Sequence, residues 1–197
     1  WKLNENSGVT AFDSVGSNHG SIQGPTWDTG KSESALSFDG MQTEYVSVPF
    51  DTSLSLNHDY SVSFWIYPTD NTVQWRTFLT RPDQFTCSYI GNDKIRVHVS
   101  GYANIDSTVS APRNTWTHVV FTYENTDAGD DKIVLYVNGE KDGQVGPTWG
   151  TPNNPSNALL MGGDATSSYY TGKLDEILLY DTVLSTEHVN SIYNHYE

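Results

Sequence analysis

Paired carboxylates are the first groups in this sequence that could perform chemistry, because hydrolysis of a glycosidic bond needs two carboxyl groups that face the same bond. The nearest acidic pairs are Asp130-Asp131 and Asp175-Glu176, and each consists of adjacent residues. Adjacent residues on a strand point to opposite faces of a sheet. The sequence therefore offers no paired acid and base, and we predict no catalytic residues and no enzymatic activity.

The imidazole and thiol groups do not indicate a zinc or nucleophile site. No histidine has the His-x-x-His or Glu-x-x-His spacing of a zinc site; the six are His19, His58, His98, His118, His188 and His195. The single cysteine, Cys87, cannot close an intrachain disulfide. It lies in the alternating stretch 85–90, so we expect a small half-buried hydrophobic side chain rather than a reactive thiol.

Aromatic residues in polar or Gly-rich segments are the candidate ligand-binding groups. They are Trp75, Tyr102, Trp149, Tyr169 and Tyr170. Sugars present flat C–H faces that stack on such rings, while their hydroxyls need polar partners. Each ring could instead tuck into the edge of the fold, since isolated exposed aromatics are common. By contrast, Trp65 and Trp116 lie inside strand patterns and are expected in the core.

The charge balance restricts the class of partner. With 24 acidic and 10 basic residues, the formal net charge is −14, which repels phosphate backbones and disfavours nucleic acid and anionic membranes. No stretch approaches the roughly 18 apolar residues of a membrane span, and the first residues lack the regions of a signal peptide. We therefore expect a module excised from a larger extracellular or cell-surface protein, with the targeting signal outside this segment. The acidity could equally reflect a saline habitat.

Short runs of β-branched and aromatic residues recur between turn residues, as in an all-β sandwich or barrel. Residues 60–67 carry apolar bulk on both faces, which predicts a central strand that ends at Pro68. Asn138-Gly139 predicts a tight turn in a hairpin over residues 133–145. Residues 174–180 indicate another strand, and we expect Ser185 to be the N-cap of a short terminal helix.

Several segments, in this order, carry a family resemblance. They are residues 13–20, 35–40, 44–49, 60–66, 116–120, 135–140 and 172–180, followed by Leu184-Ser185. Together they resemble the laminin G-like branch of the concanavalin A-like lectin and glucanase superfamily. The resemblance implies one domain over residues 1–197, an all-β, two-sheet antiparallel jelly-roll β-sandwich with a short C-terminal helix.

The resemblance also implies a structural calcium ion. Calcium needs six to eight oxygen ligands, usually carboxylates and carbonyls of a flexible loop, and the Gly-containing loop 13–20 offers such groups. Asp39 and Asp175 match positions where the family pattern places acidic ligands, so the expected side-chain ligands are Asp13, Asp39 and Asp175, with Asn18 or its neighbours contributing carbonyls. The alternative is that these aspartates cap turns, as Asp before Gly commonly does.

We therefore expect a non-catalytic extracellular carbohydrate-binding or adhesion module with a structural Ca²⁺. Its partner would be a neutral glycan or glycoprotein, beside other domains of the parent chain, without nucleic acid or membrane insertion. One alternative is a protein-binding adhesion or spacer module. A second is a glycoside hydrolase or lyase of the same fold, although no Glu-x-Asp-x-x-Glu run of the glucanase branch is present.

Overall fold

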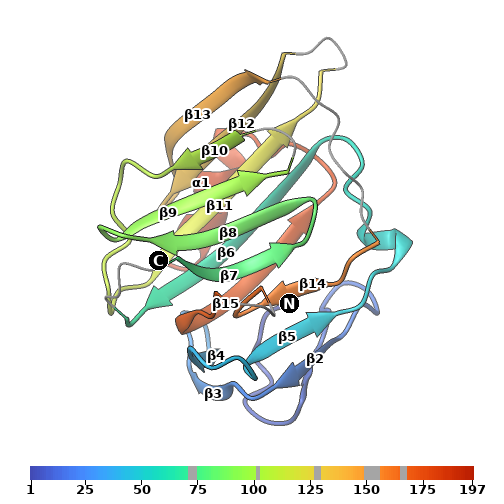
Figure 1. Cartoon of the computed structure of the whole chain (residues 1–197), viewed down its shortest axis with the longest axis vertical. Coiled ribbons are helices and arrows are strands. Elements are labelled where there is room, and N and C mark those ends of the chain that lie inside the picture. The colour runs from blue at the N-terminus through green and yellow to red at the C-terminus, as the bar shows by residue number, and fades with distance from the viewer. Residues whose placement is uncertain (71–74, 101–102, 127–129, 149–155, 165–167) are drawn as a thin grey trace.

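Two antiparallel sheets face each other in the computed structural model, which describes residues 1–70, 75–100, 103–126, 130–148, 156–164 and 168–197 (Figure 1). The eight-stranded sheet has the order β1 (Thr10–Ala11), β2 (Gly20–Gln23), β5 (Tyr45–Val48), β14 (Leu159–Met161), β7 (Arg76–Arg81), β8 (Phe85–Ile90), β9 (Lys94–Val99) and β10 (Ala103–Asp106). The predicted two-sheet antiparallel sandwich is confirmed.

The seven-stranded sheet has the order β13 (Glu140–Thr148), β12 (Asp131–Val137), β11 (Thr117–Glu124), β6 (Tyr60–Pro68), β15 (Thr171–Tyr180), β4 (Ser34–Asp39) and β3 (Thr26–Thr29). A 3-10 helix, η1 (Thr52–Leu54), and one α-helix, α1 (Thr186–His195), complete the described elements. None of the helices in the described ranges is long and apolar enough to cross a membrane.

Strand β6 lies at the centre of its sheet, as its two apolar faces predict. Val62, Phe64 and Ile66 point between the sheets and are fully buried. Phe64 packs on Phe78 of the opposite sheet, with 5.2 Å between ring centroids. Alternate residues therefore fill the interior, and the intervening residues of β6 face outward.

The hairpin of β12 and β13 has the predicted turn and register. Asn138 and Gly139 both adopt positive φ values, 51° and 81°, as a two-residue turn between strands requires. Ile133 pairs with Val145 across the hairpin. The turn residues thus determine which side chains of the hairpin point inward.

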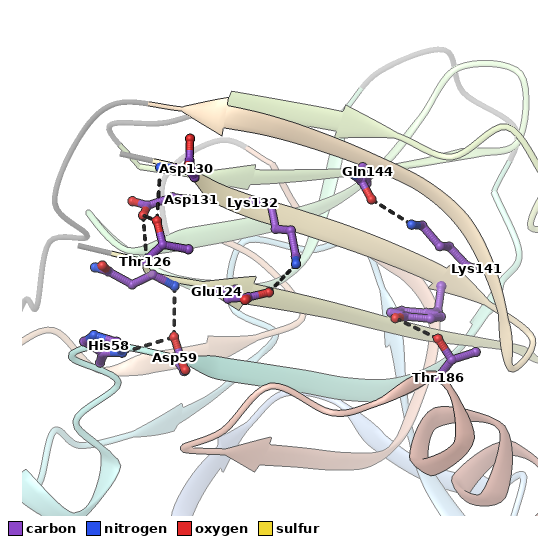
Figure 2. Close-up of polar contacts among 12 residues, drawn as sticks. His58, Asp59, Glu124, Thr126, Asp130, Asp131, Lys132, Lys141, Gln144 and Thr186 are labelled. Carbon is purple, nitrogen blue, oxygen red and sulfur yellow. Dashed lines mark hydrogen bonds and ion pairs between the residues drawn. The ribbon is translucent and has the colours of Figure 1, made fainter. Parts of the chain in front are cut away.

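Helix α1 covers the outer face of the seven-stranded sheet. The Ser185 side chain accepts a hydrogen bond from the His188 backbone N–H and caps the helix. Val189 packs in a cluster with Val120 and Tyr136; the hydroxyl of Tyr136 also lies 3.4 Å from that of Thr186 (Figure 2). This α-helix is the only one in the described ranges, so the outer face of the eight-stranded sheet has no helical cover.

Two aromatic predictions and the cysteine prediction have distinct outcomes. Trp65 is buried, but on the outer face of β6, where Tyr193 of α1 stacks on it at 5.7 Å. Trp116 is only half-buried and precedes β11, so its assignment to the core was wrong. Cys87 is free and fully buried, and burial raises the pKa of its thiol well above the usual value.

Candidate functional site

Three of the five predicted ligand-binding aromatics lie in the described ranges, and their surroundings differ. Trp75, directly before β7, is 53% exposed. Tyr170 is 1% exposed and packs on Phe78 in the core, so its ring is not available to a ligand. Tyr169 is half-buried. Tyr102 and Trp149 lie outside the described residues. Trp75 is therefore the residue around which a site can be built.

A shallow pocket of about 340 Å³ lies beside Trp75 on the outer face of the eight-stranded sheet. Its other lining residues are Thr86 and Ser88 of β8, Arg96 and His98 of β9, and Asn104 of β10. Cross-strand register explains the gathering. Ser88 pairs with Arg96, and Thr86 pairs with His98, which in turn pairs with Asn104.

An ion pair fixes the position of Arg96 at this pocket. Arg96 Nε and one terminal nitrogen donate to the two carboxylate oxygens of Asp106, a bidentate pairing with preferred geometry. Hydrogen bonding with Arg96 lowers the pKa of Asp106, and the same bond raises the pKa of Arg96. The Arg96 guanidinium lies over the Trp75 ring, 4.7 Å from its centroid. Asp106 therefore compensates the charge of Arg96, while the guanidinium supports the indole through a cation–π contact.

The neighbouring polar groups are linked by hydrogen bonds that leave further donor and acceptor atoms available to a ligand. His98 Nδ1 lies 2.8 Å from Asn104 Oδ1, which leaves the amide nitrogen of Asn104 and the second ring nitrogen of His98 for other partners. The hydroxyl of Thr86 is 2.8 Å from that of Thr80. An exposed ring beside fixed donors and acceptors can stack on a sugar ring and bond its hydroxyls.

Sequence reasoning named Trp75 as a candidate and did not name its neighbours in the pocket. The signal for them is alternation, because Thr86 and Ser88 flank the buried Cys87, and Arg96 and His98 flank the buried Val97. This pattern predicts that the four polar residues share the outer face. It does not say which strands are adjacent, so Asn104 could not be placed beside His98 without the register.

The predicted calcium ligands Asp13 and Asn18 lie together in one loop, but hydrogen bonds occupy the Asp13 carboxylate. Its oxygens accept from the backbone N–H groups of Val15, Gly16 and Asn18 at 3.0–3.1 Å. The Asn18 carbonyl accepts from the Trp1 indole at 2.8 Å. Although partial burial alone would raise it, the pKa of Asp13 is lowered because these three backbone donors stabilise its ionised form. The loop has the hydrogen bonding of a capped turn.

The other two predicted ligands lie elsewhere. Asp39 pairs with Thr171 of β15, and Asp175 follows Thr171 by four residues on the same strand. At a rise of about 3.3 Å per residue, Asp175 lies roughly 13 Å along the strand from Thr171. The buried Asp175 carboxylate accepts from the backbone N–H groups of Lys31, Ser32 and Glu176. Within the described ranges, no three His, Cys, Asp or Glu side chains are grouped to hold a metal ion. The four predicted residues do not fit one calcium site.

The two acidic pairs have separate structural partners. Asp131 is buried, and its carboxylate accepts from the Thr126 N–H at 2.9 Å, whereas Asp130 is exposed and donates its N–H to the Thr126 hydroxyl (Figure 2). In the second pair, Glu176 accepts a hydrogen bond from the Tyr196 hydroxyl at 2.8 Å. Neither pair presents two carboxyl groups to one open pocket among those described.

Several solved structures share this architecture. Domain 4 of AbnA, a GH43 extracellular arabinanase from Geobacillus stearothermophilus solved in complex with arabinotriose, is 21% identical with a TM-score of 0.70; the alignment covers 98% of this chain and 95% of that one. The binding domain of Paraclostridial Mosquitocidal Protein 1 is 16% identical with a TM-score of 0.74, over 99% of this chain and 53% of that one.

The receptor binding domain of the botulinum neurotoxin C/D mosaic serotype is 17% identical with a TM-score of 0.75, over 98% of this chain and 50% of that one. The chain thus spans about half the length of these two toxin domains. At such identities the likeness concerns the fold. No curated protein sequence matches the chain.

A family model provides the assignment that these distant structures cannot. The model for a laminin G domain, described as the concanavalin A-like lectin/glucanases superfamily, matches residues 39–190, which is most of the chain. The matched region includes β6, β11, β12 and β15 of the seven-stranded sheet and the whole Trp75 pocket. The chain belongs to the concanavalin A-like lectin/glucanases superfamily.

Proposed function

We propose that this chain is a non-catalytic, extracellular carbohydrate-binding module that holds a neutral glycan on the outer face of its eight-stranded sheet. The observation that carries the proposal is the exposed Trp75 ring, supported by Arg96 and bordered by His98, Asn104 and Thr86. An indole next to fixed hydroxyl, amide and imidazole groups matches a sugar ring with one apolar face and polar edges.

Local charge supports a neutral ligand. Among the described lining residues Arg96 is the one Lys or Arg, and its charge is compensated by Asp106. The whole chain carries a formal net charge of −14, which opposes the approach of sulfated or uronic polymers. Domain 4 of AbnA was solved with arabinotriose, a neutral oligosaccharide. Arabinotriose and linear arabinan are therefore the first ligands to test.

The direction of the polar residues suits a linear chain. Thr86, His98 and Asn104 occupy paired positions on three adjacent strands and form a row across the sheet. Strands in a sheet are about 4.8 Å apart, which is close to the length of one sugar unit. Successive units of a glycan crossing the strands would each meet a new polar side chain.

The absence of catalysis in this proposal rests on the acidic pairs. Asp131 and Glu176 are engaged in hydrogen bonds within the fold, and neither lines the Trp75 pocket. We expect no release of reducing sugar from arabinan, xylan or β-glucan. Release that disappears on substitution of one acidic residue would contradict this part of the proposal.

Binding measurements with a small set of variants test the proposed function. Wild-type protein should bind at least one neutral polysaccharide from a panel of arabinan, xylan, galactan and β-glucan in affinity electrophoresis. Trp75→Ala should lose most of this retardation, and Trp75→Phe should keep part of it. Val15→Ala is the control, because Val15 is 96% exposed and is not among the lining residues of the pocket. Equal retardation of Trp75→Ala and wild type would refute this site.

A protein-binding adhesion or spacer module is the second candidate, favoured by a groove between α1 and the end of β15. The groove has a volume of about 570 Å³, and its lining includes Leu178, Tyr180, Leu184 and Ile192. Such an apolar surface suits contact with another domain. If this function is the principal one, Ile192→Asp should abolish attachment of the module to its partner, and Trp75→Ala should not affect it.

A structural calcium ion stays a proposal that comes from the family resemblance. The loop of Asp13 and Asn18 would have to bind it mainly through backbone carbonyls and water, because Asp39 and Asp175 lie elsewhere. Calcium in such a loop would add to stability through preferential binding to the folded chain.

A further inference from the structure

We propose a second glycan-binding surface on the opposite side of the molecule, formed by Trp116, Tyr67, Lys173 and Ser37 on the outer face of the seven-stranded sheet. This inference rests on the proposed carbohydrate-binding function and adds a site to it. We call these four residues the Trp116 surface. Each step of the argument comes from strand register, exposure or charge pairing.

Strand register places the Trp116 surface in a single row. Thr117 pairs with Ile66, so the preceding Trp116 lies beside Tyr67, with ring centroids 5.3 Å apart. Tyr67 pairs with Lys173 of β15, and Lys173 pairs with Ser37 of β4. The row therefore crosses the sheet as two aromatic rings, an ammonium group and a hydroxyl.

Helix α1 does not cover this row. Its last turn reaches the neighbouring row, where Tyr193 and Tyr196 contact Trp65. Tyr67 lies two residues further along β6, a step of about 6.6 Å away from the covered ring. Tyr67 and Trp116 are both half-buried, whereas Trp65 is 1% exposed. The two rings thus present a partly open aromatic surface beyond the end of the helix.

The charges of the Trp116 surface are compensated, which favours a neutral ligand here as well. Lys173 Nζ lies 2.9 Å from the Asp28 carboxylate and donates to the Thr29 carbonyl at 3.2 Å. Hydrogen bonding with Lys173 lowers the pKa of Asp28. The same ammonium lies 5.4 Å from the Tyr67 ring centroid and holds that ring from one side. The arrangement repeats that of Trp75, Arg96 and Asp106 on the other sheet.

Sites on the outer faces of two packed sheets point in opposite directions. A glycan chain on the Trp75 pocket cannot reach the Trp116 surface without passing around the sandwich. We therefore expect one protein molecule to hold two separate glycan strands. Such a bivalent module would cross-link a polysaccharide rather than only adhere to it.

Indole N–H signals in a ¹⁵N-correlated NMR spectrum test the inference directly. Titration with arabinotriose, and then with xylotriose and cellotriose, should shift the signals of both Trp75 and Trp116, assigned from single substitutions. Trp65, buried under α1, is the internal control and should not shift. In the Trp75→Ala protein the Trp116 signal should still shift, with an unchanged midpoint.

Variants of the second surface give the complementary result. Tyr67→Ala should weaken the binding reported by Trp116 at least about tenfold, as expected for loss of an aromatic contact, and leave the Trp75 midpoint unchanged. Melting curves establish that each variant is folded. A Trp75 shift without a Trp116 shift would overturn the second surface and leave the proposed function standing. A Trp116 shift without a Trp75 shift would overturn the Trp75 site alone, and no shift with any trisaccharide would contradict both.

Discussion

Asp13 illustrates how one residue type can serve two chemistries. An aspartate in a Gly-containing loop suits a calcium site, yet its carboxylate here accepts from three backbone N–H groups of its own loop. N–H donors present positive charge, so they satisfy the carboxylate without a metal. The residue identity alone could not distinguish these roles, because the distinction depends on which way the loop amides point.

Substitution of Asp13 separates the hydrogen-bonding role from a calcium role. We expect Asp13→Ala to lower the free energy of unfolding by about 1 kcal/mol, since the loop amides lose their acceptor. Urea denaturation with calcium and with chelator measures this. The calcium proposal further requires chelator to destabilise the wild type. Identical wild-type curves in both conditions would contradict the calcium proposal, and an unchanged Asp13→Ala curve would contradict the hydrogen-bonding role.

Asp175 makes stability depend on pH. Burial raises the pKa of its carboxyl to about 8, although three backbone N–H groups act in the opposite direction. In the unfolded chain an aspartate titrates near 3.9. Between about pH 4 and pH 8 the folded state therefore retains a proton that the unfolded state has lost, so the contribution of Asp175 to stability falls as pH rises.

Asp175→Asn should remove this dependence, because an amide does not titrate. The free energy of unfolding of the wild type should decrease more steeply between pH 4 and pH 8 than that of the variant, as measured by urea denaturation. The difference between the two curves is informative because all other titrating groups are shared. Parallel curves would show that Asp175 is ionised in the folded protein throughout this range.

At the level of elements, the hairpin turn of β12 and β13 also supports the helix. Gly139 has a φ of +81°, and a Cβ at this position would lie 3.0 Å from the Tyr193 side chain of α1. The glycine therefore meets two requirements, a left-handed backbone and close approach of a ring. Sequence reasoning identified the first from Asn138-Gly139, but the second depends on where α1 docks.

Gly139→Ala should destabilise the protein by about 1–2 kcal/mol from the backbone alone, with a further loss if Tyr193 must move. Gly143→Ala in the same hairpin is the matched control, because its Cβ would meet only the Ile105 side chain at 3.5 Å. It should be nearly neutral. Thermal melts of both variants test the prediction, and equal melting temperatures for Gly139→Ala and Gly143→Ala would contradict it.

Central strands were predictable and irregular strand positions were not. Residues 60–67 and 133–137 are short runs rich in β-branched and aromatic residues, as strands buried on both faces require. In β15 the pairing register shifts between Asp175 and Leu178, and Glu176 has a positive φ of 49°. No glycine or proline marks this bulge in the sequence. Tertiary contacts of the buried Asp175 hold it instead.

For the whole molecule, composition and alternation predicted an all-β sandwich or barrel with a terminal helix, and the family resemblance implied two antiparallel sheets; the structure confirms the two-sheet sandwich with its helix. They were not enough to predict which outer face the helix covers. That choice determines which aromatics are buried: Trp65 lies under α1, while Trp116 lies beyond it and Trp75 is on the uncovered sheet. The candidate sites therefore depend on helix docking and strand order, which local sequence does not encode.

The central claim is that the Trp75 ring serves binding rather than folding, and paired measurements on Trp75→Ala test it most directly. Isothermal titration calorimetry with the polysaccharide fragment that binds the wild type gives affinity, and urea denaturation of the same sample gives stability. We expect the binding free energy to weaken by about 1–2 kcal/mol, which is roughly tenfold in affinity. The free energy of unfolding should change by less than about 1 kcal/mol, because the ring loses only its cation–π contact with Arg96. Unchanged affinity, or a loss of about 3–5 kcal/mol of stability typical of a core aromatic, would contradict the claim.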